Sequence, residues 1–456
     1  MPVGDRVEDV ANLAALTDRL FGNALIRRVL RNSGYLFSAT GIAAFLSMLQ
    51  SILAARLLGV TDFGILGTIT MFTSVINKFA SFRMSELVVK YIGQFTVNGD
   101  EQRAAAVFKS AGIVEVLTSV FAFGLIWLMA PLGAIYFAKD AGTVNWFILY
   151  GFIVLANLMA ESSTGLMQIF DQYRIIAGIT IGQSFLTLGM ISLAYLTHGG
   201  LREVVLAYMS GKIAGAVALT LAALAIATRR WGFGWWRTPL SLLRSEKREL
   251  VRFALSTNVS ATINLVNKDG ELLWVSALRN PTEAGYYKLA LSLANLVQLP
   301  VAPLPQATYP ELSREVAARK WVNMRYVLRQ GSLFALAYSG AASLFLLIFG
   351  RPLISTIYSP DFLPAYPALL ILMGGALVAN TFYWNRIALL SLGLAGYPAR
   401  VNLAAAALKI AGVLTIVPRF GYLGSASLLS GFYLFSVSLN VSKTRAEVNR
   451  REGVPG

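Results

Sequence analysis

The sequence predicts an all-α polytopic membrane protein of about 12 spanning helices, arranged as two six-helix lobes. Three observations predict this class. The composition is strongly apolar, the apolar residues form long runs, and lysine and arginine gather in alternate connections between those runs. Long runs without the period of two of a β-strand are typical of spanning helices rather than of a membrane barrel.

The composition excludes several common classes of protein. Hydrophobic residues make up 56% and charged residues 14% of the 456, against about 45–50% and about 25% in a soluble domain. An ordinary soluble enzyme, a disordered chain and a disulfide scaffold are excluded, the last because the chain has no cysteine. The net charge of +16 would suggest a nucleic-acid partner. So few charges, however, leave no broad basic face for a phosphate backbone.

The apolar residues are numerous enough for the predicted helices. They amount to roughly 255 of the 456 residues, and one spanning helix needs about 20. The predicted spans are 34–56, 63–88, 105–130, 143–167, 173–197, 203–228, 253–278, 284–308, 326–349, 362–388, 399–417 and 422–442.

Lysine and arginine predict the orientation of these spans. Four segments hold 21 of the 39 positive residues: the N-terminal tail, 229–252, 314–329 and the C-terminal tail. The six connections of the other side hold one each, namely Arg56, Lys139, Arg202, Arg279, Arg351 and Arg419. This alternation requires an even number of spans, and we expect both termini in the cytoplasm.

The spans divide the chain into five segments. These are a leader (1–32), a first lobe (33–228), a basic cytoplasmic linker (229–252), a second lobe (253–442) and a cytoplasmic tail (443–456). The leader lacks the positive start and the apolar run of a cleavable signal peptide. Apolar residues near helical spacing, such as Leu13, Leu16 and Leu20, leave two interpretations open. The leader is either a helix on the inner membrane surface or a loosely ordered segment.

A weak internal repeat relates the two predicted lobes. Residues 61–64 (TDFG) align with 282–285 (TEAG) at an offset of 221, and SAT at 38–40 aligns with SAT at 260–262 at an offset of 222. Two halves that both begin in the cytoplasm are parallel repeats, and transporters built this way hold their substrate between the halves. Chance similarity between apolar helices is the alternative.

Cations at bilayer depth mark a candidate substrate site. Charged groups in a membrane are costly and usually face the bundle interior or a water-filled cavity. The deep lysines are Lys78, Lys212, Lys268 and Lys409, and Arg83 lies near the cytoplasmic end of its span. A cavity lined by cations favours an anionic cargo such as a phosphate or diphosphate. Two alternatives stay open: neutralisation of each lysine within the bundle, and snorkelling of Arg83 to the interface.

Acids at the same depth mark a candidate ion-coupling site. They are Asp269, Glu271, Glu161 and Glu115. The first two belong to the densest polar cluster in any span, where Gly270 weakens the helix. These two would bind a proton or a sodium ion, unless they only balance Lys268. Glu161 and Glu115 are each the lone acid of their span, and each would carry a proton or pair with a lysine on another helix.

No catalytic or metal-binding motif occurs in the sequence. The single histidine, His198, falls in a short outer loop, and there is no cysteine pair, P-loop or zinc motif. The outer loops are short, which argues against a polymerase or ligase of envelope glycans. The sequence therefore predicts a transporter rather than an enzyme. It predicts no metal or other cofactor, and H+ or Na+ is the expected coupling ion.

Five stretches spread along the chain share features with one protein family. They are ARLLGVTDFGILG (55–67), ELLWVSALRNPTEAGYY (271–287), YPELS (309–313), IFGRPLISTIYSPDFLPAYPALLIL (348–372) and VPRFGYLGSAS (417–427). In this order they resemble the Wzx-type polysaccharide flippases of the multidrug/oligosaccharidyl-lipid/polysaccharide (MOP) exporter superfamily. The ordered set covers nearly the whole chain and is more specific than any single motif. Arg279-Asn280-Pro281 departs from the family's usual apolar-glycine approach to the eighth span.

The resemblance implies a V-shaped, MATE-like bundle that works by alternating access. It implies translocation of a polyprenyl-diphosphate-linked oligosaccharide across the cytoplasmic (inner) membrane, during assembly of O-antigen, capsule or exopolysaccharide. It also implies coupling to an ion gradient, with a role for Asp269, Glu271 and Glu161. The expected partners are the lipid-linked glycan, the lipid bilayer and the glycan polymerase machinery.

Two other functions stay open. A multidrug cation antiporter of the same fold should have a site rich in acids, whereas four deep lysines accompany four deep acids here. A non-transporting scaffold of a glycan-assembly complex is the other alternative. Loss of transport after substitution of a single lumen residue would exclude it.

Overall fold

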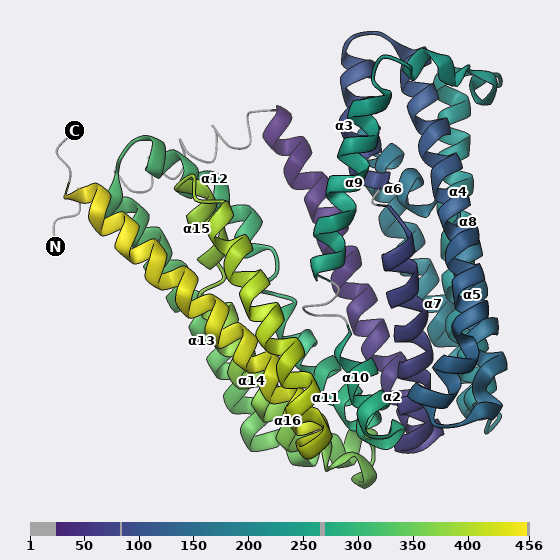
Figure 1. The fold of residues 1–456 in the computed structure, drawn as a ribbon, viewed down its shortest axis with the longest axis vertical. Coiled ribbons are helices and arrows are strands. Elements are labelled where there is room, and N and C mark those ends of the chain that lie inside the picture. The colour runs from purple at the N-terminus through teal and green to yellow at the C-terminus, as the bar shows by residue number, and fades with distance from the viewer. Residues whose placement is uncertain (1–23, 83, 265–269, 454–456) are drawn as a thin grey trace, which may run out of the picture.

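The chain folds into two lobes that meet at one end and diverge toward the other, like the arms of a V (Figure 1). The computed structural model describes residues 24–82, 84–264 and 270–453. These described residues are almost entirely helical and include no β-strand. Both ends of the described chain lie at the open end of the V (Figure 1). The predicted all-α, two-lobed fold is confirmed.

The first lobe is built around a long helix that doubles back on itself. Its elements are α2 (Ala24–Ala80), α3 (Met84–Val97), α4 (Glu101–Leu132), η1 (Gly133–Ala138), η2 (Ala141–Thr143), α5 (Val144–Ala156), α6 (Ala160–Ile169), α7 (Tyr173–Leu196) and α8 (Leu201–Trp231). Helix α2 turns at Gly59, whose φ of 70° lies in the left-handed region that glycine tolerates. It begins at Ala24, inside the predicted leader, and residues 1–23 lie outside the described residues.

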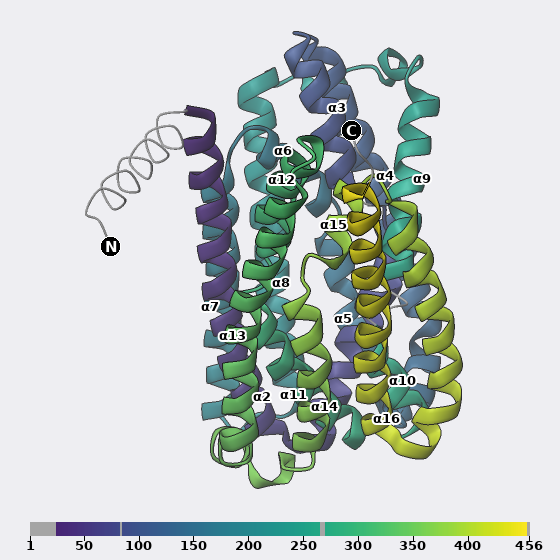
Figure 2. The same ribbon diagram turned by 90° about the vertical axis from the view of Figure 1, so that its left-hand side faces the viewer.

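The second lobe has a similar plan. Its elements are α10 (Glu271–Leu278), α11 (Pro281–Gln298), α12 (Leu304–Ala317), α13 (Trp321–Leu353), η6 (Ile354–Tyr358), η7 (Pro360–Phe362), α14 (Ala365–Thr381), α15 (Asn385–Ser391) and α16 (Gly396–Glu452). The two halves of α16 run side by side and join near Gly421 at the closed end of the V (Figure 2). Helix α16 continues through most of the predicted tail.

The segment between the lobes packs on the first lobe. After two short turns, η3 (Trp235–Arg237) and η4 (Leu240–Leu243), helix α9 (Lys247–Asn264) lies against α3 (Figure 1). Glu249 accepts a hydrogen bond of 2.8 Å from Tyr91 and forms an ion pair of 3.4 Å with Lys90. These two contacts hold the pKa of Glu249 below its usual range. The seventh predicted span is therefore shared between the lobes, because α9 belongs to the first and α10 to the second.

Membrane-spanning segments account for most of the fold. Eight helical segments among the described residues are long and apolar enough to cross a membrane. The first, Gly34–Ala80, and the last, Gly396–Glu452, each contain a kink and two predicted spans. The two predicted spans outside this set correspond to α9–α10 and α11–α12, each of which is a pair of shorter helices. All 12 predicted spans therefore overlap helices.

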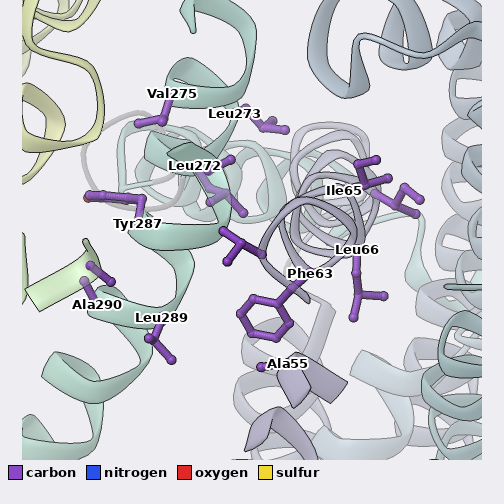
Figure 3. Packing of buried hydrophobic residues seen from close by; sticks show 14 of the residues in the cluster. Ala55, Phe63, Ile65, Leu66, Leu272, Leu273, Val275, Tyr287, Leu289 and Ala290 are labelled. Carbon is purple, nitrogen blue, oxygen red and sulfur yellow. The ribbon is translucent and has the colours of Figure 1, made fainter. Parts of the chain in front are cut away.

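Apolar side chains form both an interior and an outer surface. One buried cluster joins the lobes at the closed end, where Phe63 and Leu66 of α2 lie close to Leu272 and Tyr287 (Figure 3). Other large apolar side chains, such as Trp127, are exposed on the outside. Extensive exposed apolar surface is typical of contact with lipid. The chain is therefore a multi-pass membrane protein.

Candidate transport site between the lobes

The lobes meet where α2 crosses α11 (Figures 1 and 3). Gly64 and Gly285 lie at this crossing and are related by the 221-residue offset of the internal repeat. A Cβ atom on Gly64 would lie 1.9 Å from the carbonyl oxygen of Pro281. Reciprocally, a Cβ atom on Gly285 would lie 2.2 Å from the carbonyl oxygen of Val60. Only glycine allows the two backbones to approach so closely, and the repeats contact each other symmetrically.

Polar side chains reinforce the contact at the closed end. The hydroxyl oxygens of Thr61 and Thr282, another repeat-related pair, are 2.9 Å apart in a hydrogen bond. Arg56 donates hydrogen bonds to the backbone carbonyls of the last three residues of η6. Lys139 donates a hydrogen bond of 2.8 Å to the carbonyl of Ala277 in the last turn of α10. Cations stabilise helix C-termini, so both residues of the first lobe hold ends of second-lobe helices.

Two predicted site residues, Glu271 and Lys409, form a buried salt bridge within the second lobe. Lys409 of α16 donates a hydrogen bond to one carboxylate oxygen of Glu271, and the hydroxyl of Tyr287 donates to the other. The two charged side chains are only 6% and 2% exposed. Lys409 is therefore neutralised within the bundle, the alternative that the sequence had left open. In this conformation it does not line an open cavity.

Two further predicted residues, Glu115 and Glu161, meet at a break in the fourth predicted span. The break lies at 157–159, between α5 and α6. The buried carboxylate of Glu115 accepts hydrogen bonds from the backbone N–H groups of Glu161 and Ser162, at 2.7 and 2.9 Å. It thereby caps the start of α6. The side chain of Glu161 is exposed and accepts a hydrogen bond from the hydroxyl of Ser85 on α3.

Lys212 lies in a polar pocket beside this break. The pocket has a volume of about 280 Å³, and Asn157, Thr164, Thr180 and Gln183 contribute its polar side chains. Lys212 is exposed and makes no hydrogen bond or ion pair with any described residue. A cation surrounded by uncharged polar groups at membrane depth is available to an anionic ligand. Of the predicted deep lysines, this one best fits a ligand-binding role.

The second lobe repeats this arrangement. Its fourth span breaks at 382–384, between α14 and α15, which is 225 residues after the break in the first lobe. A pocket of about 370 Å³ lies beside the break, with walls from α11, α12, α14, α15 and α16. Arg386 is exposed on its wall and forms no ion pair with the described part of the chain. Each lobe therefore carries a polar pocket with one such cation.

One cation at the lobe junction was missed by the sequence analysis. Lys288 of α11 reaches across to α2, where it donates a hydrogen bond of 3.1 Å to the carbonyl of Phe63. Its ammonium group also lies 3.8 Å from the centroid of the Phe63 ring. Lys288 falls near the start of the predicted span 284–308 and is not among the predicted deep lysines. Its place three residues after the repeated TEAG segment (282–285) is the available signal.

Four predicted site residues remain. Lys78 is exposed in the last turn of the α2 helix. Arg83, Lys268 and Asp269 lie outside the described residues. The structure thus brings Glu271 together with Lys409 and Glu115 together with Glu161, and it places Lys212 in a pocket of its own.

The architecture is similar to that of a transporter of the MOP superfamily and to that of a lipid flippase, both of known structure. One is an inward-facing multidrug resistance MATE family transporter of that superfamily, with a TM-score of 0.67 and 12% identity, covering 91% of this chain and 96% of that one. The other is the lipid II flippase MurJ in an inward closed conformation, with a TM-score of 0.69 and 13% identity, covering 91% of this chain and 89% of that one. At these identities the likeness concerns the fold alone.

The chain belongs to the polysaccharide biosynthesis protein family, whose model matches residues 29–315. It is also similar to the inner membrane protein YghQ of Escherichia coli (strain K12). The two are 24% identical over 353 residues, which cover 76% of this chain and 97% of that protein. The family resemblance found in the sequence motifs is confirmed.

Proposed function

We propose that the protein is a flippase that moves a polyprenyl-diphosphate-linked oligosaccharide across the cytoplasmic membrane by alternating access, for the assembly of a surface polysaccharide. The observation that carries this proposal is the pair of polar pockets, one in each arm of the V and each with an exposed cation, Lys212 or Arg386. A diphosphate is an anion that such cations bind well. The family match and the fold shared with a lipid II flippase support a lipid-linked glycan as cargo.

The proposed orientation places both termini in the cytoplasm, and the distribution of lysine and arginine supports it. The open end of the V, where the described chain begins and ends (Figure 1), then faces the cytoplasm. In this state the cargo enters from the inner leaflet. Release on the other side requires the contacts at the closed end to separate. The inner membrane location of the relative YghQ, stated in its name, supports the same membrane for this chain.

Flipping in reconstituted vesicles tests the proposal. We expect Lys212→Ala to slow protein-dependent flipping of a labelled polyprenyl-diphosphate oligosaccharide roughly ten- to hundredfold, because one charge-assisted contact contributes about 1.5–3 kcal/mol. Lys320→Ala is the matched control, since Lys320 is an exposed lysine in the connection before α13. Its flipping rate should equal that of the wild type. A wild-type rate no higher than that of protein-free vesicles would contradict the proposed function.

The same vesicles separate the two alternative functions. A fold neighbour is a multidrug transporter, so a cation antiporter would accumulate a cationic dye such as ethidium in exchange for protons. A scaffold would move neither the dye nor the glycan. Flipping of the lipid-linked glycan without uptake of the dye would exclude both.

We also infer that Glu161 couples transport to an ion gradient. Its carboxylate is exposed and links α6 to α3 through Ser85, whereas Glu115 caps α6 and Glu271 binds Lys409. Binding of H+ or Na+ to Glu161 would change the link between two helices of the first lobe. Asp269 stays a prediction for this role.

An imposed gradient tests this coupling. Glu161→Gln keeps a hydrogen-bonding side chain but removes the charge, so we expect basal flipping to persist and stimulation by a proton or sodium gradient to disappear. Stimulation equal to that of the wild type would show that coupling resides elsewhere.

A further inference from the structure

The second-lobe pocket is unusually rich in amide side chains. Five of them line it: Gln298, Asn380, Asn385, Asn402 and Asn440. They come from α11, α14, α15 and both halves of α16. The first-lobe pocket holds only two amides, together with Lys212. The two pockets therefore differ in chemistry although they occupy equivalent places in the two lobes.

The protein uses only part of the hydrogen-bonding capacity of these amides. Asn440 donates a hydrogen bond of 3.0 Å to Asn385, but its own Oδ1 atom is buried and has no partner among the described residues. Gln298 and Asn402 are half-buried, and their side chains make no hydrogen bond with a described residue. A buried polar group without a partner costs about 1–3 kcal/mol. A polar ligand in the pocket would recover part of that cost.

A sugar matches the groups that the pocket offers. Each amide both donates and accepts hydrogen bonds, as each sugar hydroxyl does. Tyr433 adds an aromatic ring to the same wall, which provides an apolar surface for the C–H face of a sugar ring. The volume of about 370 Å³ falls within the range of about 300–1,000 Å³ that is typical of small-ligand sites. Arg386 adds a planar guanidinium that suits a phosphate.

The pocket also lies where a cargo between the lobes would reach it. Pro305 of α12 and Asn385 of α15 belong to its wall. Figure 1 shows α12 on the side of the second lobe that is nearer to the first. A ligand that enters the open end of the V therefore passes this wall.

Building on the proposed function, we propose that this amide pocket is a carbohydrate subsite. It holds the sugar next to the diphosphate of the cargo: Gln298, Asn402 and the neighbouring amides bind the ring hydroxyls, and Arg386 binds the phosphate. The second lobe then recognises the glycan, whereas Lys212 in the first lobe recognises its charge.

Two short-chain probes test this assignment on the purified full-length protein. One is citronellyl diphosphate joined to a single hexose or N-acetylhexosamine, and the other is citronellyl diphosphate alone. We expect the wild type to bind the glycosylated probe more tightly, as measured by isothermal titration calorimetry. Asn402→Ala and Gln298→Ala should weaken binding of the glycosylated probe about tenfold and leave binding of the sugar-free probe unchanged. Neither substitution removes a side-chain hydrogen bond to a described residue, so the variants should fold.

Gln102→Ala is the matched control, because Gln102 is an exposed amide on α4 of the other lobe. It should bind both probes as the wild type does. Equal binding of the two probes by the wild type, or equal weakening of both in the variants, would overturn the carbohydrate subsite and leave the flippase proposal standing. Failure of the wild type to bind either probe would count against the proposed function itself.

Discussion

Lys409 and Glu271 form a charged pair that the second lobe surrounds almost completely. The hydroxyl of Tyr287 donates a hydrogen bond to the carboxylate of Glu271. Removal of one partner from a buried ion pair leaves an uncompensated charge and costs about 3–5 kcal/mol. Replacement of both partners by uncharged groups of similar size costs far less. These side chains therefore behave as one structural unit.

Single and double substitutions test this unit. We expect Glu271→Gln alone and Lys409→Met alone to lower the unfolding temperature of the purified protein markedly. The double variant Glu271→Gln/Lys409→Met should recover most of the loss, because it leaves no buried charge and keeps an acceptor for Tyr287. Losses that simply add in the double variant would show that the two residues do not act as a pair.

The depth of these residues in the membrane could be predicted from the sequence, but their partners could not. Hydropathy reports depth directly, and it placed both Lys212 and Lys409 within spans. Lys409 and Glu271 are 138 residues apart, and no local pattern relates two helices at that distance. The sequence therefore could not distinguish Lys409, which is neutralised, from Lys212, which lies exposed in a pocket.

At the scale of the helices, α2 and α11 approach each other closely where they cross between the lobes. Gly64 and Gly285 each face a backbone carbonyl of the opposite helix. A methyl group at either position would overlap that carbonyl and push the helices apart. The closed end would then open more readily, or the crossing would shift.

Alanine substitutions at the crossing test this contact. We expect Gly64→Ala and Gly285→Ala to reduce disulfide formation between cysteines introduced at Thr61 and Thr282, several-fold relative to the parent protein. Gly189→Ala is the control, because Gly189 lies within α7 and has open space around it. It should leave the yield of cross-linked protein unchanged. Equal yields in all three variants would show that the glycines do not set the distance between the lobes.

The sequence predicted the spans well and the breaks poorly. Long apolar runs report spanning helices directly, and Gly270 correctly marked the weak point immediately before α10. Neither 157–159 nor 382–384 contains glycine or proline. The local sequence therefore does not predict a break at either place. At the break in the first lobe, Glu115 reaches from α4 to cap α6. Such a tertiary contact leaves no signal in the broken helix itself.

At the scale of the whole molecule, the repeat seen weakly in the sequence becomes a geometric relation. The pairs Gly64–Gly285 and Thr61–Thr282 meet at the closed end, and each lobe carries a polar pocket at the break of its fourth helix. Arg56 and Lys139, which the sequence suggested only as markers of orientation, hold the closed end together. In the proposed alternating access, separation of these contacts would open the pockets to the other side of the membrane.

A reversible lock at the closed end tests this movement most directly. The chain has no cysteine, and the hydroxyls of Thr61 and Thr282 are 2.9 Å apart, so Thr61→Cys/Thr282→Cys introduces one defined pair within disulfide range. Flipping of the labelled lipid-linked oligosaccharide is measured in vesicles before oxidation, after oxidation and after reduction. We predict that oxidation stops flipping, that reduction restores it, and that the two single variants are unaffected. Undiminished flipping by the fully cross-linked protein would contradict alternating access.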